Sequence, residues 1–121
     1  MREIVLDTET TGLKFTDNHR IIEIAAIEII DYLPTGKVFH KYVNPQRDVP
    51  ESSIDIHGIT GKFLENKPLF KEIVDEFLDF ISADSIVAHN APFDIGFLNF
   101  ELQKCGKMIL PNRAIDTVTM A

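Results

Sequence analysis

Hydrophobic residues along this chain follow two different periods, and each period predicts one kind of secondary structure. Short apolar segments rich in β-branched residues are typical of buried strands. Five segments have this character: residues 4–9, 20–30, 38–44, 85–88 and 113–116. The segment 31–36, between the second and third of these strands, contains Pro34 and Gly36 and is predicted to be a turn.

Two longer segments carry apolar residues at helical spacing. Over residues 68–81, apolar side chains form one stripe and acidic residues fall on the opposite side. The proline that begins this segment suits the first position of a helix. A second helix is predicted over residues 91–104, with Gly106 as its C-cap. Shorter helical turns are predicted at residues 51–58 and after Thr60, whose hydroxyl suits an N-cap.

These elements predict an α/β fold with one mixed sheet. Short connections among the first three strands imply an antiparallel meander, and the later strands enter through β-α-β units. Right-handed crossovers place the first strand at the centre, beside the fourth. We expect helices on both faces of the sheet, and a ligand at the carboxyl end of the central strand, where open α/β sheets bind their ligands.

Length and composition fit one compact domain over residues 1–121. Hydrophobic residues make up 45% of the chain, which suits a globular core. Cys105 is the only cysteine, so an internal disulfide is excluded. The net charge of −7 argues against an extended basic surface for a phosphate backbone. Because we find neither a signal-peptide pattern nor an apolar segment of membrane length, we expect a cytoplasmic location without membrane contact.

Two carboxylates stand at the end of the first strand. Asp7 and Glu9 are two residues apart, so in a strand they project from the same face. Paired anions raise each other's pKa unless a cation lies between them, and hard oxygen ligands suit Mg²⁺ or Mn²⁺. Gly12 allows the following turn a backbone conformation that a Cβ would resist. A solvated strand end is the alternative that the pair alone leaves open.

A third carboxylate lies at the start of the second long helix. Asp94 falls in the first turn, where the helix dipole stabilises an anion. The predicted topology places this turn near the ends of the first and fourth strands. We therefore expect Asp7, Glu9 and Asp94 to converge on a pair of metal ions. Taken alone, Asp94 also fits as a helix-start acid that satisfies free N–H groups.

Four short motifs follow one another in a specific order. They are Asp7-Thr-Glu-Thr-Thr-Gly-Leu13, Asn44-Pro45, Ile56-His-Gly-Ile-Thr60 and His89-Asn-Ala-Pro-Phe-Asp94. Together they resemble the DEDD-type 3′–5′ exonucleases, and within that family the proofreading epsilon subunits of bacterial DNA polymerase III. The resemblance covers the whole chain. It implies a ribonuclease-H-like fold, which agrees with the predicted sheet.

The resemblance assigns roles to eight residues. Asp7, Glu9 and Asp94 match the family's catalytic, metal-binding carboxylates. Five others match positions that line the pocket for the terminal nucleotide: Thr10, Leu13, Ile56, His57 and Phe93. The resemblance also implies two divalent metal ions, Mg²⁺ or Mn²⁺, and in-line hydrolysis at the 3′ end of single-stranded DNA that releases nucleoside 5′-monophosphates. Proofreading during DNA replication, with a polymerase catalytic subunit as partner, is implied in the same way. For His57, an ordinary turn residue remains the alternative.

The family's third motif does not occur in this sequence. That motif, a His followed five positions later by an Asp, supplies the general base and a fourth carboxylate. Only His89 and Asp94 have this spacing, and Asp94 already belongs to the preceding motif, so we do not interpret His89 as the base. Asp116 is interpreted as an N-cap rather than a substitute ligand. We therefore expect residues 1–121 to be a C-terminally incomplete exonuclease domain without a general base.

Such a domain is expected to hold metal weakly, to cleave slowly and to expose an apolar strip near the sheet. Two other functions remain open. An RNA exonuclease of the same superfamily, such as ribonuclease T, would be compatible with the same Ile56–Thr60 loop. A non-catalytic module that docks a polymerase or nucleic acid would share the fold, although the presence of all three carboxylates argues against it.

Overall fold

A five-stranded sheet in the order β3-β2-β1-β4-β5 forms the centre of the computed structural model, which describes residues 1–118. Its strands are β1 (Arg2–Thr10), β2 (Ile21–Ile30), β3 (Leu33–Tyr42), β4 (Ser85–Ala88) and β5 (Ala114–Asp116). β1 pairs antiparallel with β2 and parallel with β4, while β5 continues the parallel half. The predicted α/β class, the meander and the central position of the first strand are confirmed.

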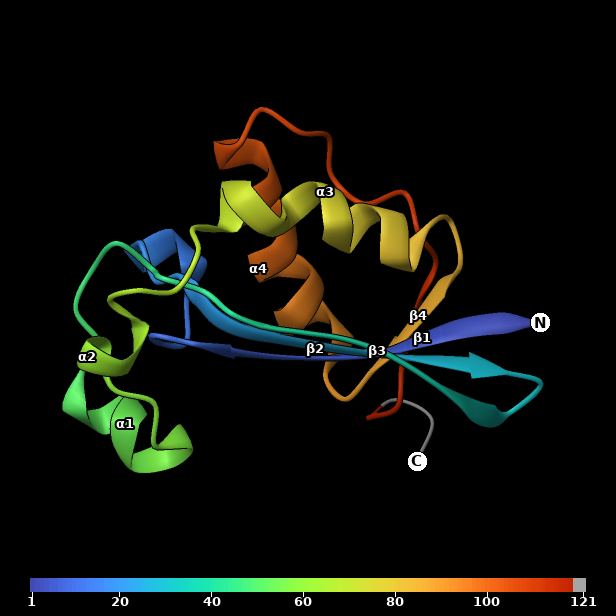
Figure 1. Ribbon diagram of the computed structural model, residues 1–121, viewed down its shortest axis with the longest axis horizontal. Helices are drawn as coiled ribbons and strands as arrows, with labels where there is room; N and C mark the ends of the chain where they lie inside the picture. The colour runs from blue at the N-terminus through green and yellow to red at the C-terminus, as the bar shows by residue number, and fades with distance from the viewer. Residues whose placement is uncertain (119–121) are drawn as a thin grey trace.

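The helices lie above one face of the sheet and beyond one of its ends (Figure 1). They are η1 (Phe15–Asp17), α1 (Glu51–His57), α2 (Gly61–Leu64), α3 (Phe70–Ile81) and α4 (Ala91–Lys104). The two long helices, α3 and α4, lie on the same side of the sheet, whereas α1 and α2 lie beyond the end at which β1 finishes (Figure 1). Among residues 1–118, no helix combines the length and the hydropathy that a membrane crossing requires.

The expected helices on both faces of the sheet are not found within residues 1–118. Along β1, Ile4 and Leu6 are buried beneath the helices. The alternate residue Val5 is 39% exposed, and its neighbours across the sheet, Ile27 and Val38, are 38% and 56% exposed. The reason is that the apolar sides of α3 and α4 pack into the same core. The opposite face therefore presents the apolar strip that the sequence predicts.

One apolar stripe of α3 supplies much of that core. Its buried residues are Phe70, Ile73, Val74, Phe77 and Ile81. They belong to the same hydrophobic core as the buried residues of β1 and β2 and the α4 residues Phe97, Leu98 and Leu102. The helix begins two residues later than the predicted position of Pro68, because Leu69 is its extended N-cap and donates its N–H to Oε1 of Glu72 at 2.8 Å.

The turn between β2 and β3 is shorter than the predicted segment 31–36. Asp31 and Tyr32 both have positive φ, at 50° and 70°, as a two-residue hairpin turn with primed geometry requires. Pro34 and Gly36 lie within β3 instead. Because β3 is an edge strand, the missing N–H of Pro34 costs no hydrogen bond inside the sheet.

Candidate active site

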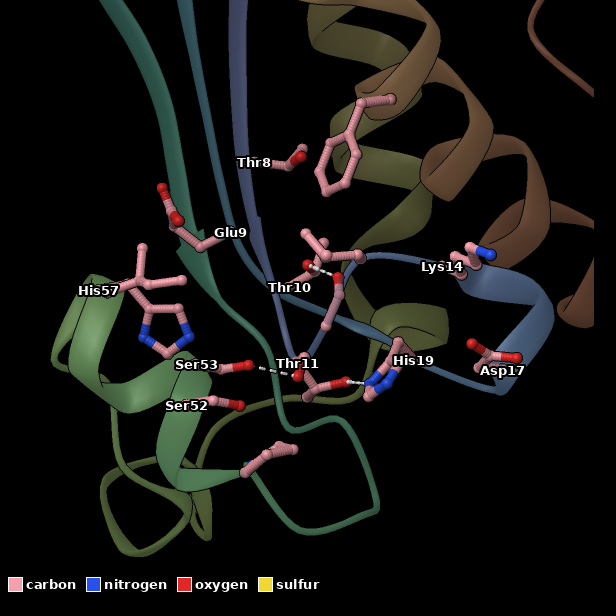
Figure 2. Close-up of a pocket in the computed structure, with 15 residues that line it drawn as sticks. Thr8, Glu9, Thr10, Thr11, Lys14, Asp17, His19, Ser52, Ser53 and His57 are labelled. Atoms are coloured by element: carbon pink, nitrogen blue, oxygen red, sulfur yellow. Dashed lines mark hydrogen bonds between the residues drawn. The ribbon is translucent and has the colours of Figure 1, made fainter.

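A pocket of about 600 Å³ opens at the carboxyl end of β1. Its walls come from the end of β1 and the loop that follows, from α1, and from the first turn of α4. The short helix α1 ends where Gly58, with φ at 73°, donates its N–H to the carbonyl of Ile54 at 2.7 Å. This end places the last turn of α1 beside β1, with His57 near Glu9 (Figure 2).

All five residues assigned to nucleotide binding line this one pocket. They are Thr10, Leu13, Ile56, His57 and Phe93. They come from three segments that are far apart in the sequence. Leu13 and Ile56 are 81% and 80% exposed, so two large apolar side chains remain open to solvent at the pocket. Their role in nucleotide binding stays a prediction, but their convergence is a fact of the fold.

His57 presents a hydrogen-bond donor that has no acceptor. Its Nδ1 accepts the N–H of Ile59 at 3.0 Å, so the neutral ring carries its proton on Nε2. Nε2 is buried, and no atom among residues 1–118 accepts from it. A buried donor without a partner is costly unless a ligand satisfies it. Because the ring also lines the pocket, it is suited to bind an oxygen of a ligand there.

Asp7 and Glu9 project from the face of β1 that the helices leave open. Asp7 is exposed and Glu9 is half-buried, and Glu9 lines the pocket. Burial and the negative charge of Asp7 raise the pKa of Glu9, while His57 lowers it and Glu23 on β2 raises it further. The end of β1 therefore carries concentrated negative charge that a cation would relieve.

Asp94 approaches the same strand from the helix side. Its side chain is 3% exposed, and its Oδ1 accepts the N–H of Thr8 at 3.2 Å and the hydroxyl of Thr8 at 2.5 Å. Burial raises the pKa of Asp94 to about 6; the bonds from Thr8 oppose this rise, and the charges of Asp7 and Glu9 add to it. The three carboxylates thus interact electrostatically around the end of β1.

These carboxylates do not form a preassembled metal cluster. Within residues 1–118, no three His, Cys, Asp or Glu side chains are grouped closely enough to hold an ion. Both hydrogen bonds to Asp94 end on Oδ1, so among these residues Oδ2 accepts no hydrogen bond and remains available to a cation. Hard oxygen donors fit a divalent ion chemically, and the raised pKa values of Glu9 and Asp94 reflect burial and negative charge that such an ion would offset. The shared metal site itself stays a prediction.

Asp116 and His89 lie beside this region without joining the pocket. Oδ1 of Asp116 accepts the N–H of Val118, two residues later, at 3.0 Å, and the N–H of Asn90 at 3.0 Å. The first bond closes a turn after β5, and the helix that Asp116 is predicted to cap would lie outside the described residues. The second bond holds the start of α4 against β5. His89 is exposed, with Nδ1 3.3 Å from the hydroxyl of Thr117.

Several pocket residues were not found from the sequence. Thr8 anchors Asp94. Seven further side chains line the walls: Thr11, Lys14, Asp17, His19, Pro50, Ser52 and Ser53. The alternation along β1 could have indicated that Thr8 faces away from Asp7 and Glu9, but its contact with Asp94 became visible only in the fold. The loop residues carry no periodic signal and became visible only in the fold.

Replacing Asp94 with Asn is expected to stabilise the metal-free protein near neutral pH. The free energy of unfolding should rise by at most about 3 kcal/mol, and the thermal midpoint should rise with it. The pKa of Asp94 rises from 3.8 to about 6, so between these values the folded chain holds a proton that the unfolded chain has released. Stability from this group is therefore present below about pH 4 and is lost as the pH rises through about 6. Asn does not ionise, and its amide oxygen can still accept from Thr8.

Thermal denaturation in EDTA from acid to neutral pH measures this effect. Asp79→Asn, on the exposed side of α3, makes the same chemical change away from the pocket and is the matched control. A midpoint for Asp94→Asn that follows the wild-type pH curve throughout would show that Asp94 titrates normally.

The chain from residue 4 to residue 121 matches the family model described as exonuclease. The DNA polymerase III subunit epsilon of Rickettsia felis is 53% identical over 100% of this chain and 55% of its own length. The corresponding subunits of Buchnera aphidicola from Acyrthosiphon pisum and of Pasteurella multocida are 50% and 46% identical over 99% of this chain, and 54% and 50% of their own lengths. The chain thus spans about half the length of these curated relatives.

Solved structures agree with the sequence relatives. Exonuclease X in complex with 5′ overhanging duplex DNA has a TM-score of 0.73 and 28% identity, over 98% of this chain and 61% of that one. Product-bound exonuclease I has a TM-score of 0.87 over 98% of this chain and 30% of its own, and at 17% identity it supports the fold alone. With the pocket, the carboxylates and the family match in agreement, this chain belongs to the exonuclease family.

Proposed function

We propose that residues 1–121 form the nucleotide-binding and metal-binding part of a 3′–5′ exonuclease that removes nucleoside 5′-monophosphates from a DNA 3′ end. The observation that carries this proposal is the pocket at the end of β1, which gathers all five residues assigned to the terminal nucleotide together with Glu9. A pocket for one nucleotide suits the end of a DNA strand, where no further nucleotide has to be accommodated, and the family resemblance selects the 3′ end.

Each wall of the pocket has a role in holding the terminal nucleotide. Leu13, Ile56 and Phe93 supply apolar surface against a base or sugar. The backbone N–H of Thr10 is proposed to bind the 3′-hydroxyl. His57 donates from Nε2 to a sugar or phosphate oxygen, which satisfies the one buried side-chain donor without a partner among residues 1–118. These contacts orient the scissile phosphate toward the carboxylates.

Asp7, Glu9 and Asp94 are proposed to hold two divalent ions, Mg²⁺ or Mn²⁺. When bound, such ions activate water and stabilise the charge that develops on the attacking and leaving oxygens. Thr8 fixes Oδ1 of Asp94 through two hydrogen bonds and leaves Oδ2 for a cation. Burial and, after it, the negative charge around β1 raise the pKa values of Glu9 and Asp94, and positive ions would lower both.

We further propose that the whole protein proofreads newly made DNA as a polymerase subunit. Relatives at 46–53% identity are DNA polymerase III epsilon subunits, and they are about twice as long as this chain. None of the four His residues here except His89 has an Asp five positions later, and that Asp is Asp94. The general base and a fourth carboxylate are therefore assigned to sequence outside residues 1–121, and slow cleavage by these residues alone is proposed.

Digestion of a 5′-labelled single-stranded DNA, with the chain in excess over substrate, tests the function. With Mg²⁺ or Mn²⁺ we expect products that shorten by one nucleotide at a time from the 3′ end, and none in EDTA. An RNA of the same sequence is the comparison. Faster shortening of RNA would favour the RNA exonuclease, and tight binding of both strands without any turnover would favour a binding module. Internal cuts alone would contradict the proposal.

A further inference from the structure

The turn after β1 forms one wall of the pocket, and His19 holds it in place. The side chain of Thr11 is fully buried, and its Oγ1 accepts the N–H of Arg20 at 3.0 Å. Oγ1 of Thr11 also lies 2.8 Å from Nδ1 of His19, and it donates its proton there when the neutral ring is protonated on Nε2 (Figure 2). A ring that accepts at Nδ1 carries its neutral-state proton on Nε2.

The same ring lies against the backbone of Gly12. A Cβ built on Gly12 would lie 2.4 Å from Cε1 and from Nε2 of His19, far inside contact distance. The φ of Gly12 is not in the left-handed region, so the need for glycine comes from the close approach of His19 and not from the backbone turn that the sequence predicts. The carbonyl of Gly12 also accepts the hydroxyl of Thr10 at 2.5 Å.

Helix α1 fixes the turn from the other side. The hydroxyl of Ser53 donates to the carbonyl oxygen of Thr11 at 2.6 Å, and Ser53 is 8% exposed. Two residues, His19 and Ser53, thus clamp the segment Thr11–Gly12 between the η1 loop and the helix that carries His57 (Figure 2). Leu13 follows this segment directly in the chain.

We propose that His19 is a positioning residue of the nucleotide pocket: by packing on Gly12 and accepting from Thr11, it fixes the turn that presents Thr10 and Leu13 to the terminal nucleotide. This inference rests on the proposed function. His19 lines the pocket at the end opposite Glu9, near Lys14 and Asp17, so it acts on the wall and not on the carboxylates (Figure 2).

Binding of thymidine 5′-monophosphate in the presence of Mg²⁺ tests the inference without requiring turnover. His19→Ala is expected to raise the Kd at least about fivefold, because a loosened wall orients the nucleotide poorly. His19→Asn places an amide oxygen where Nδ1 was, and is expected to return the Kd to within about twofold of wild type. Thermal midpoints of each variant set a titration temperature at which all of them are folded.

Arg47→Ala is the matched control. The guanidinium of Arg47 donates from Nη1 to the carbonyl of Asn18, at 3.2 Å, so this variant loosens the same loop one residue away from His19. Arg47 does not line the pocket. The control is expected to leave the Kd unchanged. An equal rise of the Kd for Arg47→Ala and His19→Ala would attribute the effect to general loop stability and would overturn the inference.

A double-mutant cycle with Gly12→Ala tests the ring contact itself. Gly12→Ala alone is expected to raise the Kd about as much as His19→Ala, because its methyl group displaces the ring. In the His19→Ala background the same change should add less than about twofold. Independent, additive effects would overturn the inference. A wild-type chain that binds no nucleotide would refute the proposed function and the inference with it, whereas wild-type binding with unchanged His19→Ala binding refutes the inference alone.

Discussion

Replacing Asp7 with Asn is expected to lower the metal-dependent release of mononucleotides from a DNA 3′ end by at least about 100-fold relative to the unaltered chain. Asp7 is exposed at the end of the central strand, and its charge raises the pKa of both Glu9 and Asp94. Asp7 is therefore the carboxylate whose charge contributes to the pKa shifts of both others. Asn keeps the shape and removes the anion, so an ion held there loses a charged ligand.

The assay is the shortening of a 5′-labelled DNA strand, accompanied by titration of Mn²⁺ binding. Asp79→Asn changes the net charge equally on the exposed side of α3, and should retain the wild-type rate and affinity. A second consequence separates charge loss from misfolding. Without Asp7, the pKa of Asp94 should fall below about 6, which shifts the pH dependence of stability toward acid. If Asp7→Asn cleaved DNA at the wild-type rate, the proposed role of the carboxylates in the reaction would be refuted.

Replacing Glu101 with Gln is expected to lower the free energy of unfolding by about 3 kcal/mol. Glu101 is 1% exposed on α4, where its two oxygens accept from Nε and Nη2 of Arg20 at 2.9 and 2.6 Å. Oε2 also accepts the N–H of Ile21 at 3.0 Å. Gln keeps the volume but leaves the largely buried guanidinium without its anion, and an unpaired buried charge is strongly destabilising.

Urea denaturation of purified variants provides the measurement. Glu76→Gln is the matched control, since Glu76 lies 3.4 Å from Lys41 and its side chain is 62% exposed. That surface pair should contribute less than about 1 kcal/mol. Adding Arg20→Met to Glu101→Gln removes the unpaired cation and should recover more than half of the loss. Equal losses for the buried and the exposed pair would show that the Arg20–Glu101 pair does not tie α4 to β2.

Local spacing in the sequence predicts much of this fold. The five strands, the helical stripe of α3 and the N-cap at Thr60 all occur in the structure, although β3 begins at Leu33 and not at residue 38. Thr60 accepts the N–H of Phe63 at 3.2 Å. Spacing by two predicts that Asp7 and Glu9 share a face, and the first-turn position of Asp94 follows from the start of α4. These features depend on residues a few positions apart, whose geometry the backbone fixes.

Other features depend on which distant segments meet. Glu101 appears in the sequence as one more acid on a helix, yet it is buried against Arg20, 81 positions away. Both long helices pack on one face because their buried apolar residues share a core, which neither helix reveals alone. The glycine of the first motif is required by a ring seven residues later and not by its own backbone.

By itself the sequence determined the central place of the first strand and the carboxylates at its end, and its resemblance to a known family picked out five of the residues that line the pocket. Only the tertiary structure decided that Asp94 reaches this strand through Thr8, that His57 keeps a donor without an acceptor, and that His19 packs on Gly12. The physical reason is the separation in sequence between the residues that interact. Backbone geometry sets the direction of each side chain, but packing between segments remote in the chain sets what that side chain meets.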